Sequence, residues 1–242
     1  MTREEAEAVR ILRAYGDPAC YEEMVQAIVR GCAEDIDAHE DGVLLCHAVA
    51  KAYMLAWRTR ERLERMLARV PADGSDIVLH GTLDEQTLRG IQERFSLANV
   101  LYMREYAYYG AIPERETAFD VRPLEMDALD FVYENYGHAS REYIEARLRS
   151  GVMLGAYDGD AIAGFIGEHA EGSEGLLHVM PAYRRRGVGA ALERAAIRRM
   201  MLQGFTPYGQ VLEGNEVSHA LQARLGMTRA QGRVYWLTND TL

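Results

Sequence analysis

The stretch VMPAYRRRGVGAAL, residues 179–192, places three consecutive arginines beside two glycines. It lies where the apolar segment Leu176–Met180, typical of a strand, gives way to a helical pattern from Gly187 to about Gln203. Such a junction leaves the first backbone N–H groups of the helix without partners, at the positive end of the helix dipole. The stretch therefore predicts an anion site, where the glycines let a phosphate approach the backbone.

The spacing of the motif, Arg184-x-x-Gly187-x-Gly189, separates it from two other phosphate-binding patterns. It is neither the dinucleotide fingerprint nor the loop of nucleoside triphosphatases, because no Gly-Lys-Ser/Thr follows. The motif alone is short enough to occur by chance. Three alternatives remain open from it: nucleic acid, a phosphate-bearing cofactor, and a helix face that meets only water.

Charge narrows these alternatives. The chain carries a net charge of −10, which disfavours general nucleic-acid binding because that depends on neutralising many phosphates. Between Leu176 and Arg199, however, six arginines accompany the single acidic residue Glu193, a local balance of +5. A basic island in an acidic protein favours a small anionic ligand over a long polyanion, so no nucleic-acid partner is expected.

Length and composition predict a soluble, cytoplasmic protein. The 242 residues are 48% apolar, which suits one large domain or two small ones. No run approaches the roughly 20 apolar residues of a membrane span, and the charged start MTREEAEAVR is unlike a secretory signal. No membrane partner is therefore expected. The three cysteines match neither a disulfide framework nor a zinc site, so reduced thiols and no metal are expected.

The second half alternates regularly between strand and helix patterns. Strands are predicted at 119–123, in two apolar runs around the Asp158-Gly159 turn, and at 175–180, 208–212 and 233–238. Helices are predicted at 124–136, 141–149, 187–203 and 215–226. This order predicts the α/β class, with a mixed sheet and helices on both faces.

The first half shows a similar but weaker order. Helices are predicted through the first forty residues, then strands within 42–57, a helix at 58–70, a strand at 76–81, a helix at 84–95 and a strand at 99–108. The aperiodic segment Gly110–Ala118 predicts a linker. We therefore expect two domains, 1–115 and 119–242, the first faintly repeating the element order of the second.

Two motifs together resemble a known family. Arg-x-x-Gly-x-Gly after a strand resembles the acyl-CoA pyrophosphate loop of the GNAT superfamily of N-acetyltransferases, and GQVLEGNEVSHALQARLGM, residues 209–227, is similar to its second hallmark. The resemblance covers about Phe119 to Leu242. GFTPYGQV at 204–211, Asn215 with Ser218, and the amino-terminal extension resemble more narrowly the glycine N-acyltransferase-like branch.

The resemblance implies acetyl-CoA as cosubstrate and assigns roles to the motif residues. Backbone groups of a splayed strand bind the pantetheine arm, the glycine loop cradles the pyrophosphate, and arginine side chains pair with phosphates. Asn215 binds the arm or a structural water, with helix capping as the alternative. The implied cofactor contacts are Leu177, Val179, Arg184, Arg185, Arg186, Gly187, Val188, Gly189, Ala190, Asn215, Ser218 and Gln222.

Acyl transfer to an amine needs a neutral amine, a polarised thioester carbonyl and a proton for the leaving thiolate. Many relatives carry a tyrosine seven residues after the Asn as the proton donor, whereas this chain has Gln222, which cannot supply one. Candidate bases are His178, Glu174 and Glu168 on or beside the central strands. The alternatives are a packed sheet-face histidine and solvated hairpin ends. Tyr208 is expected to serve packing.

The first half resembles a degenerate copy of the same fold. Its equivalent junction, LAWRTRERLER at 55–65, contains no glycine, so one cofactor site per chain is expected. The leading hypothesis is an N-acetyltransferase that moves an acetyl or acyl group to a small-molecule amine or amino acid in a ternary complex. The alternatives are an acyl-CoA-binding module with little turnover and acetylation of a protein amine. A monomer or homodimer is expected.

Overall fold

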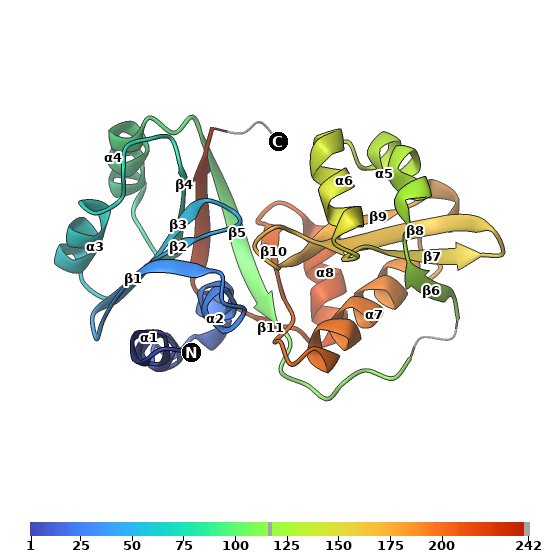
Figure 1. Ribbon diagram of the computed structural model, residues 1–242, viewed down its shortest axis with the longest axis horizontal. Helices are drawn as coiled ribbons and strands as arrows, with labels where there is room; N and C mark the ends of the chain where they lie inside the picture. Colours follow the sequence, from blue (N-terminus) through green and yellow to red (C-terminus); the bar gives the residue numbers. More distant parts are fainter. Residues whose placement is uncertain (116–117, 240–242) are drawn as a thin grey trace. The chain divides into compact units, whose positions relative to one another are not determined.

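The computed structural model describes residues 1–115 and 118–239, which fold into two compact units (Figure 1). Unit 1 comprises Met1–Ala107, Gln210–Glu216 and the segment that begins at Thr228; unit 2 comprises Tyr108–Gly209 and Val217–Met227. The predicted linker has no regular secondary structure where it is described, and its residues Glu116 and Thr117 lie outside the described part.

Unit 1 contains a mixed sheet in the strand order β1-β2-β3-β4-β12-β5, with β11 paired to β5. Its helices are α1 (Arg3–Arg13), α2 (Glu22–Val29), α3 (Arg60–Leu67) and α4 (Glu85–Phe95), with a 3₁₀ turn at Pro18–Tyr21. Its strands are β1 (Ala33–His39), β2 (Gly42–His47), β3 (Ala52–Trp57), β4 (Asp76–Gly81), β5 (Asn99–Ala107), β11 (Thr228–Arg229) and β12 (Arg233–Thr238).

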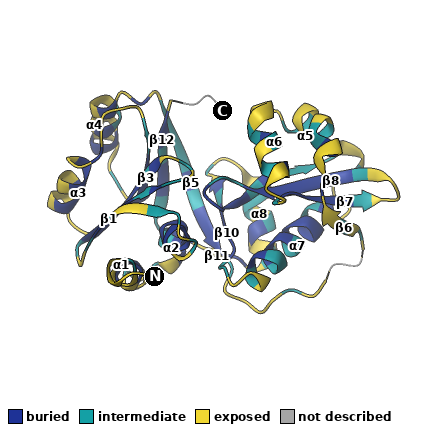
Figure 2. Ribbon diagram, viewed as in Figure 1, coloured by how far each residue is buried: buried dark blue, intermediate teal, exposed yellow. Residues whose placement is uncertain are grey.

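Helices cover both faces of this sheet. In β2, Val43 and Leu45 join the apolar cluster of α1 and α2, while Leu44 between them joins the cluster of α3 and α4. This is the alternation of side chains expected along a strand. Because both faces are covered, β2, β3 and β4 carry nearly continuous apolar runs and are mostly buried. Figure 2 shows β3 in dark blue, whereas the edge strand β1 and the outer sides of the helices are partly yellow.

One prediction for the first forty residues is wrong. Residues 33–39 form strand β1, which pairs antiparallel with β2 from Ala33↔His47 to His39↔Gly42. The strand lies at the edge of the sheet, and its pairing register shifts between Glu34 and Asp37. An edge strand with a bulge exposes polar side chains, so its sequence lacks the regular apolar alternation that would identify it.

Unit 2 contains a mixed sheet in the strand order β9-β8-β7-β6, to which β10 contributes Tyr208 and Gly209 before the chain enters unit 1 at Gln210. Its strands are β6 (Asp120–Pro123), β7 (Leu154–Asp158), β8 (Ala161–Glu168), β9 (Glu174–Val179) and β10 (Tyr208–Leu212). Its helices are α5 (Leu129–Tyr136), α6 (Arg141–Arg149), α7 (Val188–Leu202) and α8 (Glu216–Leu225), with 3₁₀ turns at Met126–Ala128 and Pro181–Tyr183. The predicted mixed α/β class is confirmed.

The last strand departs from the expected contiguous halves. Sequence order alone groups β12 with the second half, but β12 lies between β4 and β5 of unit 1 and pairs antiparallel with both. Buried Val234, Tyr235 and Leu237 complete the two apolar clusters of that unit. Strand pairing, not chain continuity, therefore decides where β12 packs. No helix in the described ranges is long and apolar enough to cross a membrane.

Candidate functional site

The arginine stretch forms an exposed loop at the start of α7. Arg185 and Gly187 adopt left-handed backbone conformations, with φ of 60° and 90°, and Gly187 is the N-cap of the helix. No side chain caps this end of α7. The first N–H groups of this 15-residue helix therefore have no side-chain cap and lie next to exposed arginines in the chain, a combination that favours an anion.

The three arginines differ in their contacts. The Nε of Arg184 donates to the carbonyl oxygen of Val179 at 3.2 Å, which ties the loop to the end of β9. The guanidinium of Arg186 lies 4.9 Å from the Tyr183 ring and 3.7 Å from an oxygen of Asp158. Arg185 makes no ion pair among the described residues and is exposed. All three side chains are accessible to an anion from solvent.

Strands β9 and β10 separate immediately beyond a single contact point. They are parallel, and Gly209↔Glu174 is the one register pair between them. A Cβ on Gly209 would lie 2.9 Å from the carbonyl oxygen of Glu174, so only glycine permits this approach. From Gly175 onward, β9 pairs on its other side with β8. The predicted splay is thus present, and it leaves the β10-facing edge of Leu177 and Val179 open.

The equivalent strands of unit 1 are not splayed. β3 and β4 are also parallel, but they pair continuously from Ala52↔Asp76 to Ala56↔His80. This sheet offers no open strand edge at that position, and the junction to α3 has no glycine. Within the described residues, the features of a cofactor site therefore occur in unit 2 alone.

A bulge in β9 determines which of its side chains lie on each face of the sheet. Leu176 has φ of 52°, and the β8–β9 register shifts there. Leu176 packs in the cluster of α5 and α6, whereas Leu177 and Val179 pack against the cluster of α7. Leu176 and His178 thus lie on the α5–α6 face, because His178 stacks on Phe165 of that cluster.

His178 is half-buried and close to its ring partner. Its ring centroid lies 5.5 Å from that of Phe165, with an angle of 19° between the rings. Burial lowers the pKa of His178 below its usual value, and the positive charges of Arg184 and His138 lower it further. The imidazole is therefore neutral at pH 7 and able to accept a proton.

Glu174 lies on the opposite face, in a buried cluster of carboxyl groups. Burial raises the pKa of Glu174 well above its usual value, and the charges of Glu193 and Glu168 add to the effect. Burial likewise raises the pKa of Glu193 to about 7, against the opposing hydrogen bond from Gln222. The Nε2 of Gln222 donates to Oε1 of Glu193 at 2.9 Å. Near neutral pH the Glu174–Glu193 pair therefore retains a proton.

Glu193 was not among the predicted site residues, although the sequence carries a signal for it. It occupies the apolar stripe of α7, three residues after Ala190 and four before Ile197, and it is 4% exposed. A carboxylate at such a position is rarely buried without a partner. Its pairing with Gln222 could not be read from the sequence because the two belong to different helices.

The remaining candidate residues have defined surroundings. Glu168 forms an ion pair with Arg199 of α7, and both Glu168 and Glu174 are buried, so the alternative of solvated hairpin ends is wrong. The hydroxyl of Tyr208 donates to the carbonyl oxygen of Glu171 at 2.6 Å inside the core, which agrees with a packing role. Asn215 is exposed immediately before α8, and its N–H donates to the carbonyl oxygen of Leu212.

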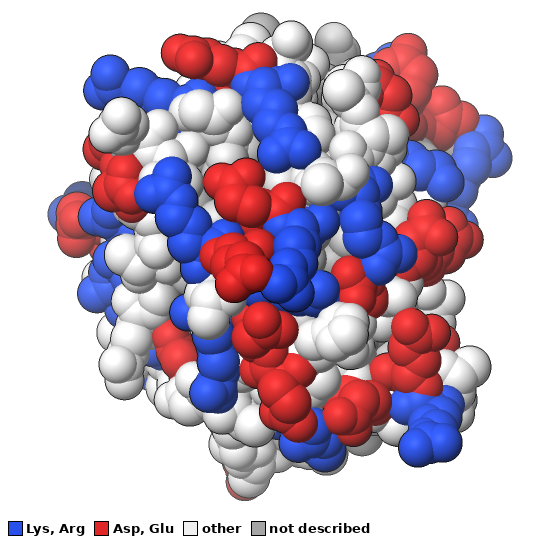
Figure 3. Space-filling model, turned by 90° about the vertical axis from the view of Figure 1, so that its left-hand side faces the viewer, with Lys and Arg blue, Asp and Glu red and all other residues white. Residues whose placement is uncertain are grey.

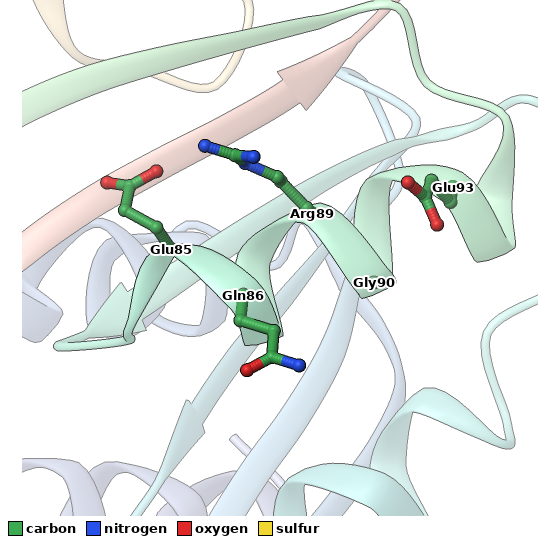
Figure 4. A pocket seen from close by; sticks show the side chains of 5 residues that line it. All are labelled: Glu85, Gln86, Arg89, Gly90 and Glu93. Atoms are coloured by element: carbon green, nitrogen blue, oxygen red, sulfur yellow. The ribbon is translucent and has the colours of Figure 1, made fainter.

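Unit 1 also has surface hollows, but they lack convergent chemistry. One is lined by residues of α4 alone, and Figure 4 shows that their side chains diverge: Glu85 and Arg89 point to one side of the helix and Gln86 to another. Positive and negative side chains alternate on the face of the molecule shown in Figure 3. Neither feature forms a single-sign patch for a polyanion.

Comparison with known proteins identifies a family for part of the chain. Residues 119–227 match the model of the acetyltransferase (GNAT) family. The search of curated proteins gave no match. Among solved structures, a Drosophila protein has a TM-score of 0.69 at 15% identity, covering 98% of this chain and 97% of its own.

Two further solved structures are GNAT proteins. An acetyltransferase of this family from Colwellia psychrerythraea has a TM-score of 0.53 at 12% identity, covering 96% of this chain and 97% of its own. A GCN5-related N-acetyltransferase from Kribbella flavida has a TM-score of 0.53 at 13% identity, covering 97% and 96%. At such identities the likeness shows a shared fold over nearly the whole chain.

Proposed function

Since residues 119–227 match the model of the acetyltransferase (GNAT) family, we propose that the chain is an acyl-CoA-dependent N-acyltransferase. It moves the acetyl, or another acyl, group of the CoA thioester to the amine of a small molecule or amino acid, with both bound at once. The observation that carries the proposal is the exposed, uncapped start of α7 beside the open edge of β9.

The cofactor is bound along β9 and the loop that follows it. The pantetheine arm pairs with the backbone of Leu177 and Val179, and the pyrophosphate lies on the N–H groups from Arg185 to Gly189, near the start of α7 at Val188 and Ala190. The arginine side chains contribute charge. Asn215, Ser218 and Gln222 of the segment around α8 complete the proposed contacts. The open edge and the two left-handed loop residues support this arrangement.

The acid and base functions divide between the two faces of β9. Neutral His178 on the α5–α6 face accepts the proton of the attacking amine, and an N–H of β9 near Val179 polarises the thioester carbonyl. The departing thiolate takes a proton from the Glu174–Glu193 pair, which replaces the tyrosine found in many relatives. The opposite directions of the two pKa shifts support this division. Glu168 holds Arg199 and is not required as a base.

Thermal unfolding with CoA and thiol release with a panel of amines test the proposal. A ligand that binds only the folded protein stabilises it by about 2.7 kcal/mol at 100 times its Kd, so millimolar CoA should raise the Tm. No Tm shift would count against the cofactor site. A Tm shift without thiol release for any amine or peptide would favour the second candidate, an acyl-CoA-binding module with little turnover. The observation behind this candidate is that Gln222, which cannot supply a proton, stands where many relatives have a tyrosine.

The narrower assignments rest on the sequence alone, and only the first of them rests on resemblance. They are the glycine N-acyltransferase-like branch, a cytoplasmic location, and a monomer or homodimer. A small acceptor is the leading hypothesis, and a protein amine is the alternative. Acylation of amino acids but not of peptides would support the small-acceptor assignment, and the reverse preference would overturn it.

A further inference from the structure

Three ionisable side chains meet in the core of unit 1, and none of them is among the proposed acyl-CoA contacts. They are Glu23 of α2, His80 of β4 and Glu105 of β5, and each side chain is 0% exposed. One ligand atom from each lies within 4.8 Å of the others. Burying two carboxyl groups and an imidazole is costly unless their charges are compensated.

Hydrogen bonds to the backbone orient the His80 ring. Its Nδ1 lies 2.8 Å from the carbonyl oxygen of Cys20, which can only accept, so Nδ1 carries a proton. The other ring nitrogen, Nε2, lies 3.2 Å from Oε2 of Glu23 without the geometry of a hydrogen bond. If Nε2 is unprotonated, two lone pairs face each other across this distance, and a cation between them would remove the repulsion.

The two carboxylates are held in the same way, each with one oxygen free. Oε1 of Glu105 accepts from the backbone N–H of Glu23 at 2.7 Å, and Oε2 of Glu23 accepts from Nε2 of Gln210 at 2.7 Å. Oε1 of Glu23, Nε2 of His80 and Oε2 of Glu105 are buried and have no hydrogen-bond partner. Each of the three side chains thus keeps one buried atom without a hydrogen-bond partner, while Oε2 of Glu23, which lies 3.2 Å from Nε2 of His80, is held by Gln210.

The donor set and its spacing suit a transition-metal ion. One imidazole nitrogen and two carboxylates are common ligands of Zn²⁺ and related ions, and two carboxylates neutralise a divalent charge. Metal–ligand bonds of about 2.0–2.2 Å imply ligand atoms roughly 3.3 Å apart in a tetrahedral site, close to the 3.2 Å between Nε2 of His80 and Oε2 of Glu23. The nearest guanidinium on β5, Arg104, pairs instead with Glu213 at 3.2 Å.

We propose that Glu23, His80 and Glu105 bind one divalent transition-metal ion that stabilises unit 1. Without the metal ion, these side chains bind protons instead. Burial lowers the pKa of His80, but the close carboxyl groups of Glu105 and Glu23 outweigh it and raise that pKa to about 10. Burial raises the pKa of Glu105 to about 7. Metal binding must therefore displace protons.

The test refolds the full chain from chelator and denaturant, because a fully buried site takes up its ion most readily during folding. Co²⁺ serves as a spectroscopic probe and Zn²⁺ as a competitor. We expect one ion per chain by elemental analysis, a visible Co²⁺ absorption band that Zn²⁺ abolishes, and a higher Tm with either ion. A refolded protein with no band, no bound metal and no Tm shift would overturn the site and leave His80 as an imidazolium between carboxylates.

A matched pair of variants localises the ion. Glu23→Gln removes a ligand, whereas Glu22→Gln changes the neighbouring buried carboxyl of α2, which accepts from Gln26 instead. We expect Glu23→Gln to weaken Co²⁺ binding by at least about 100-fold, since changes in outer-shell partners alone cost 10- to 100-fold. Equal binding by both variants would overturn the assignment. If Glu23→Gln does not fold, the metal content and spectrum of the wild-type protein still decide the question.

Discussion

At the scale of single residues, Gly187 offers a direct test of the anion site. A Cβ there would meet nothing within 4 Å, but φ is 90°; Gly204 at the other end of α7 has the same open surroundings and φ of 85°. Gly187→Val and Gly204→Val should each cost about 1–2 kcal/mol of stability. Only Gly187→Val should lose the CoA-dependent Tm shift, because the added branch blocks the phosphate.

CoA binding by Gly187→Val and Gly204→Val distinguishes a blocked phosphate site from general strain. A Gly187→Val protein that binds CoA as the wild type does would place the pyrophosphate elsewhere, and equal losses in both variants would trace the effect to strain in α7. Arg184→Ala should weaken binding less than Gly187→Val, because the backbone N–H groups make most of the proposed contacts. Calorimetric titration with CoA measures all three variants.

His178 should govern the acid side of the pH–rate profile. Its lowered pKa keeps the imidazole neutral at pH 7, so turnover should fall only as pH drops below about 6.5. His178→Ala should abolish this fall in turnover at low pH. It should also reduce turnover by about 10²-fold or more, with little change in CoA affinity. A variant whose profile matches that of the wild type would exclude His178 as the base.

Glu193 should make stability depend on pH. Its folded-state pKa is about 7 against an ordinary 4.5, so the folded protein holds a proton that the unfolded chain releases between these values. The free energy of unfolding therefore falls as pH rises through that window. Glu193→Gln removes this contribution.

We expect Glu193→Gln to gain stability relative to wild type between pH 5 and pH 8, by at least about 1 kcal/mol, because one pKa unit corresponds to about 1.4 kcal/mol. Urea unfolding at both pH values measures the change. Glu125→Gln, an exposed carboxyl in the same unit, should show no such gain. A gain that is equal at both pH values would contradict the assignment of the raised pKa.

At the scale of elements, the sequence predicts best where local chemistry decides the structure. The glycines before and after α7 mark its ends, since Gly187 and Gly204 both adopt the left-handed conformation. The bulge at Leu176 was not predictable, because its φ of 52° is imposed by pairing with β8. For the same reason, the faces of His178 and Glu174 became clear only from packing.

The open edge of β9 should respond to the cofactor in hydrogen exchange. The amides of Leu177 and Val179 face β10 beyond its one register pair with β9, so they should exchange faster than the paired amides of β8. CoA should slow the exchange of these two amides and leave β8 unchanged. Equal protection of both strands by CoA, or of neither, would contradict pantetheine pairing along β9.

At the scale of the whole molecule, the sequence predicts the α/β class and the family of the second half but not the membership of the units. Element order along the chain favours two contiguous halves, whereas Gln210–Glu216 and β12 pack with unit 1. Pairing between strands so distant in sequence leaves no local signal. The sequence of β12 predicts a strand, but it does not indicate which strands lie beside it.

A truncated chain that ends after Ala230 tests whether β12 belongs to the sheet of unit 1. It lacks β12, so β4 and β5 of unit 1 lose the strand that joins them. We expect amide exchange in β4 and β5 to rise to the level of the unfolded chain while β7, β8 and β9 remain protected. Loss of protection in unit 2 alone would contradict the strand assignment. The point variant Tyr235→Ala should weaken the same strands by about 3–5 kcal/mol.

The position of β12 also has a consequence for biosynthesis. β4 leaves the ribosome early, but its neighbour in the sheet, Arg233–Thr238, is translated last among the described strands. Synthesis adds about 5–20 residues per second, so β4 and β5 remain without the strand between them for on the order of ten seconds. Nascent chains stalled before Arg233 should therefore be sensitive to protease in β4 and β5 and should recruit chaperones.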